Sequence, residues 1–192
     1  MALVSVITAT YRRPVELARA IASVRAQTYP TVEHIVVSDG PGEWAKMVTL
    51  PTRFVSLGRN WRSFRGVESR GADPRMVGCM LAQGEYIAYL DDDNEWTPDH
   101  LECAVAELER TGADFLTTQA HVYPQDYLVG DGVLEMGHVD TSTLVHKTEC
   151  LKYGNWVATA TADDDWHLMR TWRDAGLKWA FLERETVIYH RQ

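Results

Sequence analysis

The first 115 residues alternate between short apolar runs and longer amphipathic segments. The apolar or β-branched runs have the length of strands and fall at Leu3–Thr8, His34–Ser38, Phe54–Leu57 and Tyr86–Leu90. The amphipathic segments predict helices at Pro14–Gln27, at Pro74–Gln83, and from Thr97-Pro98 to Gly112. This alternation predicts an α/β fold whose central, mostly parallel sheet is flanked by helices on both faces.

The rest of the chain has a weaker pattern. Strands are expected at Asp114–Thr118 and Val139–Val145, a helix at Asp163–Asp174, and two short strands at Trp179–Leu182 and Thr186–Tyr189. Residues 58–72 are typical of a loop, and residues 120–138 of an irregular segment that could form a hairpin. Because no repeat, linker or low-complexity tract divides the sequence, we expect a single domain over residues 1–192.

Composition narrows the classes of partner. The chain has 192 residues and a formal net charge of −8, which disfavours nucleic-acid binding because that requires a basic surface. Cys79, Cys103 and Cys150 have no C-x-x-C spacing, a pattern that favours free thiols in a reducing compartment. Since there is no leader-like start and no apolar run near the ~18 residues of a membrane span, we expect a cytoplasmic protein with no membrane span.

The clearest chemical signal is Asp91–Asp93, three carboxylates directly after the apolar run Tyr86–Leu90. A strand end is a fixed platform, and ligands of open α/β sheets bind at the carboxyl ends of strands. Adjacent carboxylates repel one another unless a cation lies among them, and oxygen ligands favour Mg²⁺ or Mn²⁺. A solvated acidic loop is the simpler explanation, but we favour a metal site that serves a phosphate-bearing substrate.

A second acidic run, Asp163–Asp165, begins the last predicted helix. Acids in a first helical turn complement the helix dipole, and the residues alone favour this ordinary role. The alternative is that Asp165 acts as a general base. His190, near the end of the chain, fits a metal ligand and a residue without function equally well. Four arginines of the predicted loop form either a solvated surface or a diphosphate clamp: Arg59, Arg62, Arg65 and Arg70.

The order of these features resembles the GT-A glycosyltransferases of the family 2 type, which use nucleotide-sugar donors. The resemblance is carried by Val4–Pro14, by Glu33–Gly40 and, most strongly, by Ala82–Trp96 (AQGEYIAYLDDDNEW). It weakens after residue 115 and returns at Asp140–Thr143, Asp163–Trp166 and Tyr189-His190. It implies a GT-A, Rossmann-like fold, with a nucleotide-binding half at residues 1–95 and an acceptor half at residues 96–192.

The resemblance also implies roles for individual residues. The donor-binding positions are Thr8, Ala9, Tyr11, Asp39, Arg75, Asp91 and Asp92. Asp91 and Asp93 match the metal-binding D-x-D pair, with Asp93 the more direct ligand, and His190 matches a His that completes the metal shell. Asp165 matches the catalytic base, with Asp164 beside it. One departure is Met76, which follows Arg75 where the family often has Asn.

Together these positions imply an inverting glycosyltransferase that depends on Mn²⁺ or Mg²⁺. It would move a sugar from a nucleotide-diphosphate donor, with UDP favoured, to a hydroxyl of a saccharide, lipid-linked or protein acceptor. One alternative is a module that binds nucleotide sugar without turnover, which the acids at both 91–93 and 163–165 disfavour. Another is a phosphatase with an aspartate nucleophile, whose signature has Thr where this chain has Glu95.

Overall fold

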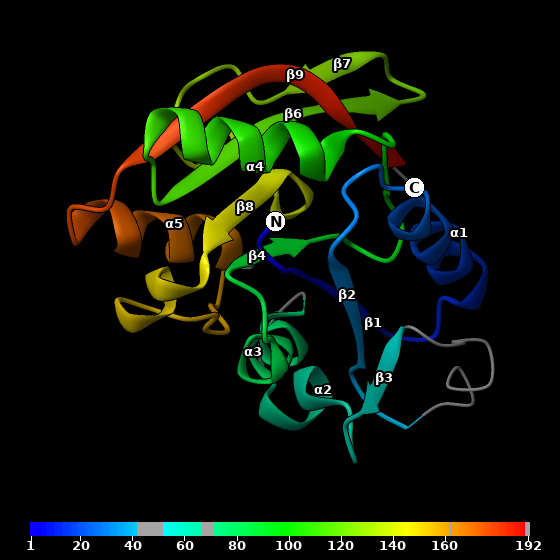
Figure 1. Ribbon diagram of the computed structural model, residues 1–192. Coiled ribbons are helices and arrows are strands. Elements are labelled where there is room, and N and C mark those ends of the chain that lie inside the picture. Colours follow the sequence, from blue (N-terminus) through cyan, green and yellow to red (C-terminus); the bar gives the residue numbers. More distant parts are fainter. Residues whose placement is uncertain (42–51, 67–70, 162, 191–192) are drawn as a thin grey trace.

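A curved, mixed sheet runs through the centre of the molecule (Figure 1). The computed structural model describes residues 1–41, 52–66, 71–161 and 163–190. Across the sheet the strands follow the order β3 (Arg53–Ser56), β2 (Val32–Ser38), β1 (Val4–Thr10), β4 (Tyr86–Tyr89), β8 (Leu144–Lys147), β6 (Phe115–Tyr123), β9 (Trp179–His190) and β5 (Glu95–Trp96). A further strand, β7 (Tyr127–Val129), pairs with β6 as a hairpin.

Strand β1 lies between β2 and β4 and is parallel to both. Strand β3 extends this parallel group beyond β2. Strand β8 joins β4 to β6 through antiparallel ladders, and β6 and β9 are again parallel. The predicted α/β class is confirmed, but the sheet is mixed rather than mostly parallel, because β8, β7 and β5 pair with their neighbours in antiparallel ladders. The parallel group brings the carboxyl ends of β1, β2 and β4 to one edge of the sheet, which is where ligands bind in such folds.

Helices cover both faces of the sheet. Helices α1 (Pro14–Arg25) and α4 (His100–Thr111) pack on one face, and α3 (Ala72–Leu81) and α5 (Asp164–Asp174) pack on the other. Strand β4 and the residue after it show the alternation that separates the two layers. Tyr86, Ala88 and Leu90 belong to the first cluster of buried side chains, whereas Ile87 and Tyr89 belong to the second.

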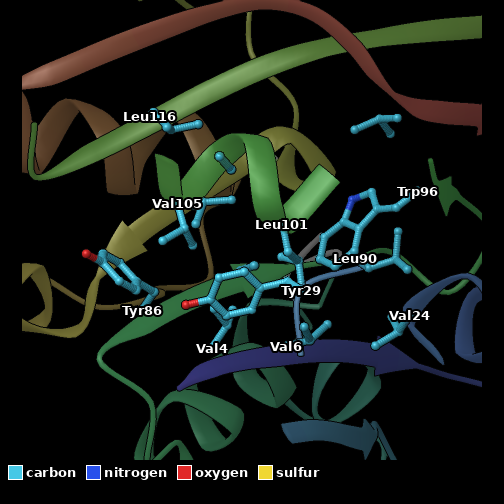
Figure 2. Close-up of a cluster of buried hydrophobic side chains, with 14 of the residues drawn as sticks. Val4, Val6, Val24, Tyr29, Tyr86, Leu90, Trp96, Leu101, Val105 and Leu116 are labelled. Atoms are coloured by element: carbon cyan, nitrogen blue, oxygen red, sulfur yellow. The ribbon is translucent and has the colours of Figure 1, made fainter. Parts of the chain in front are cut away.

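The first cluster holds α4 against the sheet (Figure 2). Leu101 and Val105 of α4 lie on one side of this cluster and Val4 and Val6 of β1 on the other. Each fully buried aliphatic side chain of this kind contributes ~1.5–3 kcal/mol relative to an exposed one. Leu90 is part of the same cluster, so the acidic turn that follows it starts from a fixed point.

Two segments differ from the sequence predictions because polar side chains cap short helices. Residues Trp61–Arg65 form helix α2 inside the predicted loop, where Asp39 Oδ1 accepts from Trp61 N at 2.9 Å. The predicted strand Val139–Val145 is divided. Asp140 caps a 3₁₀ helix, η2 (Thr141–Thr143), and the strand itself begins only at Leu144.

Two further differences lie near the edge of the sheet. The last two predicted strands are one strand, β9, because their polar middle stays paired with β6 around an irregularity near Gln119. Helix α4 starts later than predicted, with Asp99 at its N-cap, because Thr97 N donates to Thr186 O at 3.0 Å. A second 3₁₀ helix, η3 (Thr148–Lys152), follows β8. Across the described ranges, every helix is too short or too polar to cross a membrane.

Candidate functional site

A cleft of about 480 Å³ opens at the carboxyl ends of β1, β2 and β4. The predicted site residues that line it are Ala9, Tyr11, Asp39, Arg75, Asp91, Asp92 and Asp93. Lining residues that the sequence did not single out are Thr10, Arg13, Asn60, Gly71, Pro74 and Tyr189. Six of the seven predicted donor-binding positions, all except Thr8, therefore converge in one place although they lie as far as 83 residues apart in sequence.

The end of β1 contributes residues at two depths. The Thr8 side chain is buried, and its Oγ1 lies 2.9 Å from His34 Nε2, so it contacts the interior rather than lining the cleft. Two residues later, Thr10 Oγ1 donates to Asp92 Oδ2 at 2.7 Å. The hydroxyl that contacts the acidic turn is therefore that of Thr10.

Asp39, the predicted base-binding acid, is held by the start of α2. Its Oδ2 accepts from Asn60 Nδ2 at 3.0 Å, and its Oδ1 accepts from Trp61 N. Each carboxylate oxygen keeps a second lone pair for a ligand. Tyr11 is 37% exposed at this position, and a Cβ on Gly40 would lie 3.4 Å from its ring. Since Gly40 also has φ +125°, glycine lets the chain turn closely beside Tyr11.

Arg75 is a buried cation between the two acidic runs. Its guanidinium donates to the Asp91 carboxylate and lies over the Trp156 ring, 4.8 Å from the ring centroid. Gly71 makes room for it, because a Cβ there would lie 3.0 Å from Arg75 Nη1. This ion pair and cation–π contact fix the guanidinium at the wall of the cleft.

The acidic turn is crowded and partly buried. Burial raises the pKa of Asp92 to about 6, although its hydrogen bond from Thr10 and the charge of Arg13 act in the opposite direction. Burial also raises the pKa of Asp93, and the charge of Asp91 adds to that rise. The turn therefore favours either protons or cations close to its carboxylates.

The second acidic run lies next to the first. Burial raises the pKa of Asp165, with Arg75 lowering it and Asp91 raising it further, so both residues are near enough to act on this carboxyl. Asp165 Oδ1 accepts from Trp166 N at 2.7 Å, and its Oδ2 lies 3.4 Å from Thr141 Oγ1. Asp164 is buried, and its Oδ1 accepts from Thr159 N and Thr159 Oγ1.

Asp140 joins this cluster, although the sequence analysis assigned it no role in the site. Burial, together with the charges of Asp91 and Asp165, raises its pKa to about 8. Its Oδ1 accepts from Ser142 N at 2.8 Å. Ser142 Oγ in turn accepts from Asp91 N at 3.2 Å and from Asn94 Nδ2 at 3.0 Å. The signal in the sequence was the acid directly before Thr-Ser-Thr, which is typical of a helix cap.

The donor atoms of the turn suit a hard divalent cation, which takes one or two carboxylates and completes its shell with water and phosphate oxygens. In the described ranges, however, no three His, Cys, Asp or Glu side chains form a group that could hold a metal. His190 Nε2 lies 2.7 Å from Glu95 Oε1. Arg75 contacts the Asp91 carboxylate and Arg13 contacts that of Asp93. The ligand chemistry therefore fits Mg²⁺ or Mn²⁺ once an arginine has left a carboxylate.

Most of the predicted arginine clamp cannot be placed. Arg70 and the side chains of Arg62 and Arg65 lie outside the described residues. Arg59 lies over the Phe64 ring, 4.6 Å from its centroid. The clamp stays a prediction.

Comparison with known proteins identifies relatives of this chain. Residues 5–170 match the family described as glycosyl transferase family 2. The putative colanic acid biosynthesis glycosyl transferase WcaA of Escherichia coli is 34% identical over 126 residues, which cover 66% of this chain and 43% of that protein. The chain spans less than half the length of the curated relatives it matches.

Solved structures show the same fold at low identity. TarS 1–349 of S. aureus, in complex with UDP-GlcNAc, has a TM-score of 0.77 at 17% identity, covering 99% of this chain and 59% of that one. The mannosyltransferase PcManGT from Pyrobaculum calidifontis, in complex with GDP-Man and Mn²⁺, has a TM-score of 0.74 at 18% identity, covering 99% and 56%.

Proposed function

The chain belongs to glycosyl transferase family 2, and from that premise we propose that it is an inverting, cation-dependent transferase that moves a sugar from a nucleotide-diphosphate donor to a hydroxyl acceptor. The family and the GT-A fold predicted from the sequence are confirmed. Family membership also decides against the phosphatase alternative. The donor, the cation and the stereochemical course are the proposed part.

The donor nucleotide would occupy the cleft between β1, β2 and α3. Tyr11 offers an exposed ring for stacking, and Asp39, positioned by Asn60, offers carboxylate oxygens to base N–H groups. Arg75 lies where it would face the diphosphate. We favour UDP because it is the common donor nucleotide of the family, and complexes with UDP-GlcNAc and with GDP-Man among the structural neighbours keep both nucleotides open.

Asp91 and Asp93 would hold the divalent cation, together with phosphate oxygens of the donor. Such a cation, when bound, stabilises the negative charge that develops on the leaving diphosphate. His190 is proposed to join the shell after leaving Glu95. A structural neighbour, PcManGT, was solved in complex with GDP-Man and Mn²⁺, which supports a divalent cation as part of the proposal.

Asp165 is proposed as the general base, with Asp164 supporting the start of α5 through its bonds to Thr159. A base must be ionised to accept a proton, and a raised pKa makes it a stronger acceptor near neutral pH. Attack by the activated hydroxyl on the face of the sugar opposite the leaving group, in one displacement, gives inversion. The acceptor would reach the site from the half of the chain after residue 95.

The observation that carries this proposal is Arg75. One guanidinium contacts Asp91 in the donor cleft and acts electrostatically on Asp165 of α5. A leaving-group site and a base must lie near one sugar ring, and the effect of this arginine on both acidic runs supports their proximity.

The test combines nucleotide release with donor binding. The chain is incubated with Mn²⁺ and with UDP-, GDP- and dTDP-sugars, and free nucleotide is measured with and without a chelator. Asp165→Asn should lower transfer by a factor of ~10²–10⁴ and leave the donor dissociation constant nearly unchanged, because a base acts only in the transition state. Asp174→Asn, at the exposed end of the same helix, is the matched control.

Release from one nucleotide sugar that the chelator abolishes supports the proposal. Tight donor binding without turnover, across acceptors of the saccharide, lipid-linked and protein classes, would support the non-catalytic module. Unchanged transfer by Asp165→Asn would remove this residue as the base.

A further inference from the structure

The acidic turn contains a built-in cation at the carboxylate proposed to bind the metal. Arg13 Nη1 donates to Asp93 Oδ2 at 2.6 Å and to Asp92 Oδ1 at 3.1 Å. A single nitrogen therefore bridges two neighbouring carboxylates. Arg13 comes from the loop before α1, about 80 residues away in sequence, and lines the same cleft.

We propose that Arg13 and a divalent cation compete for Asp93, so that the cation binds only as the arginine side chain gives up Asp93 and stays on Asp92. The inference rests on the proposed function, because it deepens the cation dependence of that site. It adds a residue that sets the affinity for the cation without being one of its ligands.

The two carboxylates differ in the way that such an exchange requires. The Asp92 side chain is only 7% exposed and accepts from Thr10 Oγ1 as well as from Arg13. Asp93 is 23% exposed, and its Oδ2 receives the shorter of the two Arg13 bonds. Asp92 therefore remains as a partner for Arg13 after Asp93 turns to another cation.

Only the side chain of Arg13 needs to move. Its backbone is held, because Arg13 O accepts from Leu17 N at 3.0 Å in the first turn of α1. Its side chain is 44% exposed, so the guanidinium can move without opening the core. The preceding residue, Arg12, has φ +55°, a left-handed conformation that is uncommon for residues other than glycine. This backbone turn thus defines the position from which the Arg13 side chain extends to the acids.

The other arginines of the site contact other groups. Arg75 contacts Asp91. Arg19 Nη2 donates to the Asp93 carbonyl oxygen at 2.9 Å, and its Nε lies 3.2 Å from Glu95. The Arg12 guanidinium lies 5.1 Å from the centroid of the Tyr11 ring. Arg12 is therefore a matched control, since its removal changes the net charge equally and leaves the Arg13 contacts in place.

The test measures the affinity of the full chain for Mn²⁺ in the absence of nucleotide. The electron paramagnetic resonance signal of free Mn²⁺ reports how much of the ion remains unbound. Arg13→Gln should bind Mn²⁺ about three- to tenfold more tightly than the unchanged protein, the range expected for releasing a partly exposed, charge-assisted ion pair. Arg12→Gln should stay within about twofold, because Arg12 is exposed, with its guanidinium over the Tyr11 ring, and exposed charges are largely screened. Arg13→Lys, which keeps the charge but loses the planar fork, should fall between the two.

A second measurement uses the unchanged protein, in which Arg13 is present. By reciprocity, a cation that displaces Arg13 must change the environment of its guanidinium. Titration with Mg²⁺ should shift the Arg13 Nε–H signal in the NMR spectrum of the unchanged protein, the signal being assigned by its absence in Arg13→Lys.

Equal or weaker Mn²⁺ binding by Arg13→Gln, or an Arg13 signal that does not respond to saturating Mg²⁺, overturns the inference and leaves the cation dependence of transfer intact. No Mn²⁺ binding by any of these proteins overturns the inference and the proposed cation dependence together. The nucleotide-release assay with chelator then shows whether transfer proceeds without a metal.

Discussion

Gly78 offers a sharp test of how the core sets the site. It lies within α3 where this helix crosses β1, and a Cβ at this position would lie 2.5 Å from Ile7 Cγ2 and 3.2 Å from Ile7 Cγ1. Ordinary contact begins near 3.4 Å, so Gly78→Ala requires the helix or Ile7 to move by about 0.9 Å. Arg75 precedes Gly78 by one turn of the same helix, so such a shift also moves its guanidinium relative to Asp91.

The expected loss of stability is the difference between two opposing effects. Ile7 is fully buried, and overpacking a filled core costs ~1–3 kcal/mol. Alanine is favoured over glycine inside a helix by ~0.5–1 kcal/mol. Subtracting the midpoints of these ranges gives a free energy of unfolding lower by ~1 kcal/mol, which for a chain of this size corresponds to a melting temperature lower by ~2–4 °C.

Thermal and urea unfolding of Gly78→Ala and of the control Gly58→Ala measure this effect, since a Cβ on Gly58 meets no atom within 4 Å. Donor binding, followed by calorimetry, should weaken only in Gly78→Ala. Ile7→Ala completes a double-mutant cycle. Because the new methyl group would fill part of the space that Ile7 leaves, the two changes together should cost at least ~1 kcal/mol less than their sum. Additive losses, or a Gly78→Ala protein as stable as the Gly58→Ala protein, would refute the reasoning.

Two further predictions concern the acidic cluster. Because the pKa of Asp140 is raised to about 8, the folded protein holds a proton that the unfolded chain releases near pH 4, so the free energy of unfolding should fall between pH 4 and pH 8 by up to ~1.4 kcal/mol per pH unit. Asp140→Asn should make this slope shallower in urea unfolding at pH 5 and pH 8, and an unchanged slope would contradict the assignment. Ser142→Ala removes a buried acceptor shared by Asp91 N and Asn94 Nδ2 and should cost ~1–3 kcal/mol of stability and weaken donor binding, which urea unfolding and calorimetry measure. Ser63→Ala, at an exposed position, should be near neutral in both assays.

Much of the sheet was predictable because its buried strands appear in the sequence as short, mostly apolar segments. Val4–Thr10 and Tyr86–Tyr89 are continuous apolar strands, and they are buried on both faces. Strand β9 was not predictable as one element, since the polar stretch Glu183–Glu185 reads as a break. Pairing with β6 keeps this stretch in the sheet, and that pairing partner lies about 60 residues earlier. Helix α2 depends in the same way on a distant cap from Asp39.

The candidate site likewise contains residues that the sequence predicted and residues that it did not. The acids of 91–93 and 163–165 were recognisable because they sit at the end of a strand and the start of a helix, and the resemblance to a known family assigned them roles. Arg13, Ser142 and Asp140 were missed because their importance comes from contacts with residues between 20 and 80 positions away. The pattern within one short segment does not reveal contacts between residues so far apart in the chain. Conversely, the family resemblance assigned Thr8 to donor binding, but its hydroxyl contacts His34 in the interior.

Charge balance connects these observations. Asp91, Asp92 and Asp93 line the cleft, and Asp140 and Asp165 lie near enough to Asp91 to interact with it electrostatically. Among the described residues, the arginines that contact the carboxylates of this turn are Arg13 and Arg75. Raised pKa values show that the excess is relieved in part by protons, most of all at Asp140. The proposed nucleotide-diphosphate donor would add further negative charge to the same space, so we expect an added cation or further protons to favour its binding. A divalent cation at Asp93, with Arg13 kept on Asp92, would supply that charge beside the diphosphate without leaving the buried Asp92 carboxylate unpaired, so the proposed competition depends on the cation of the proposed transferase.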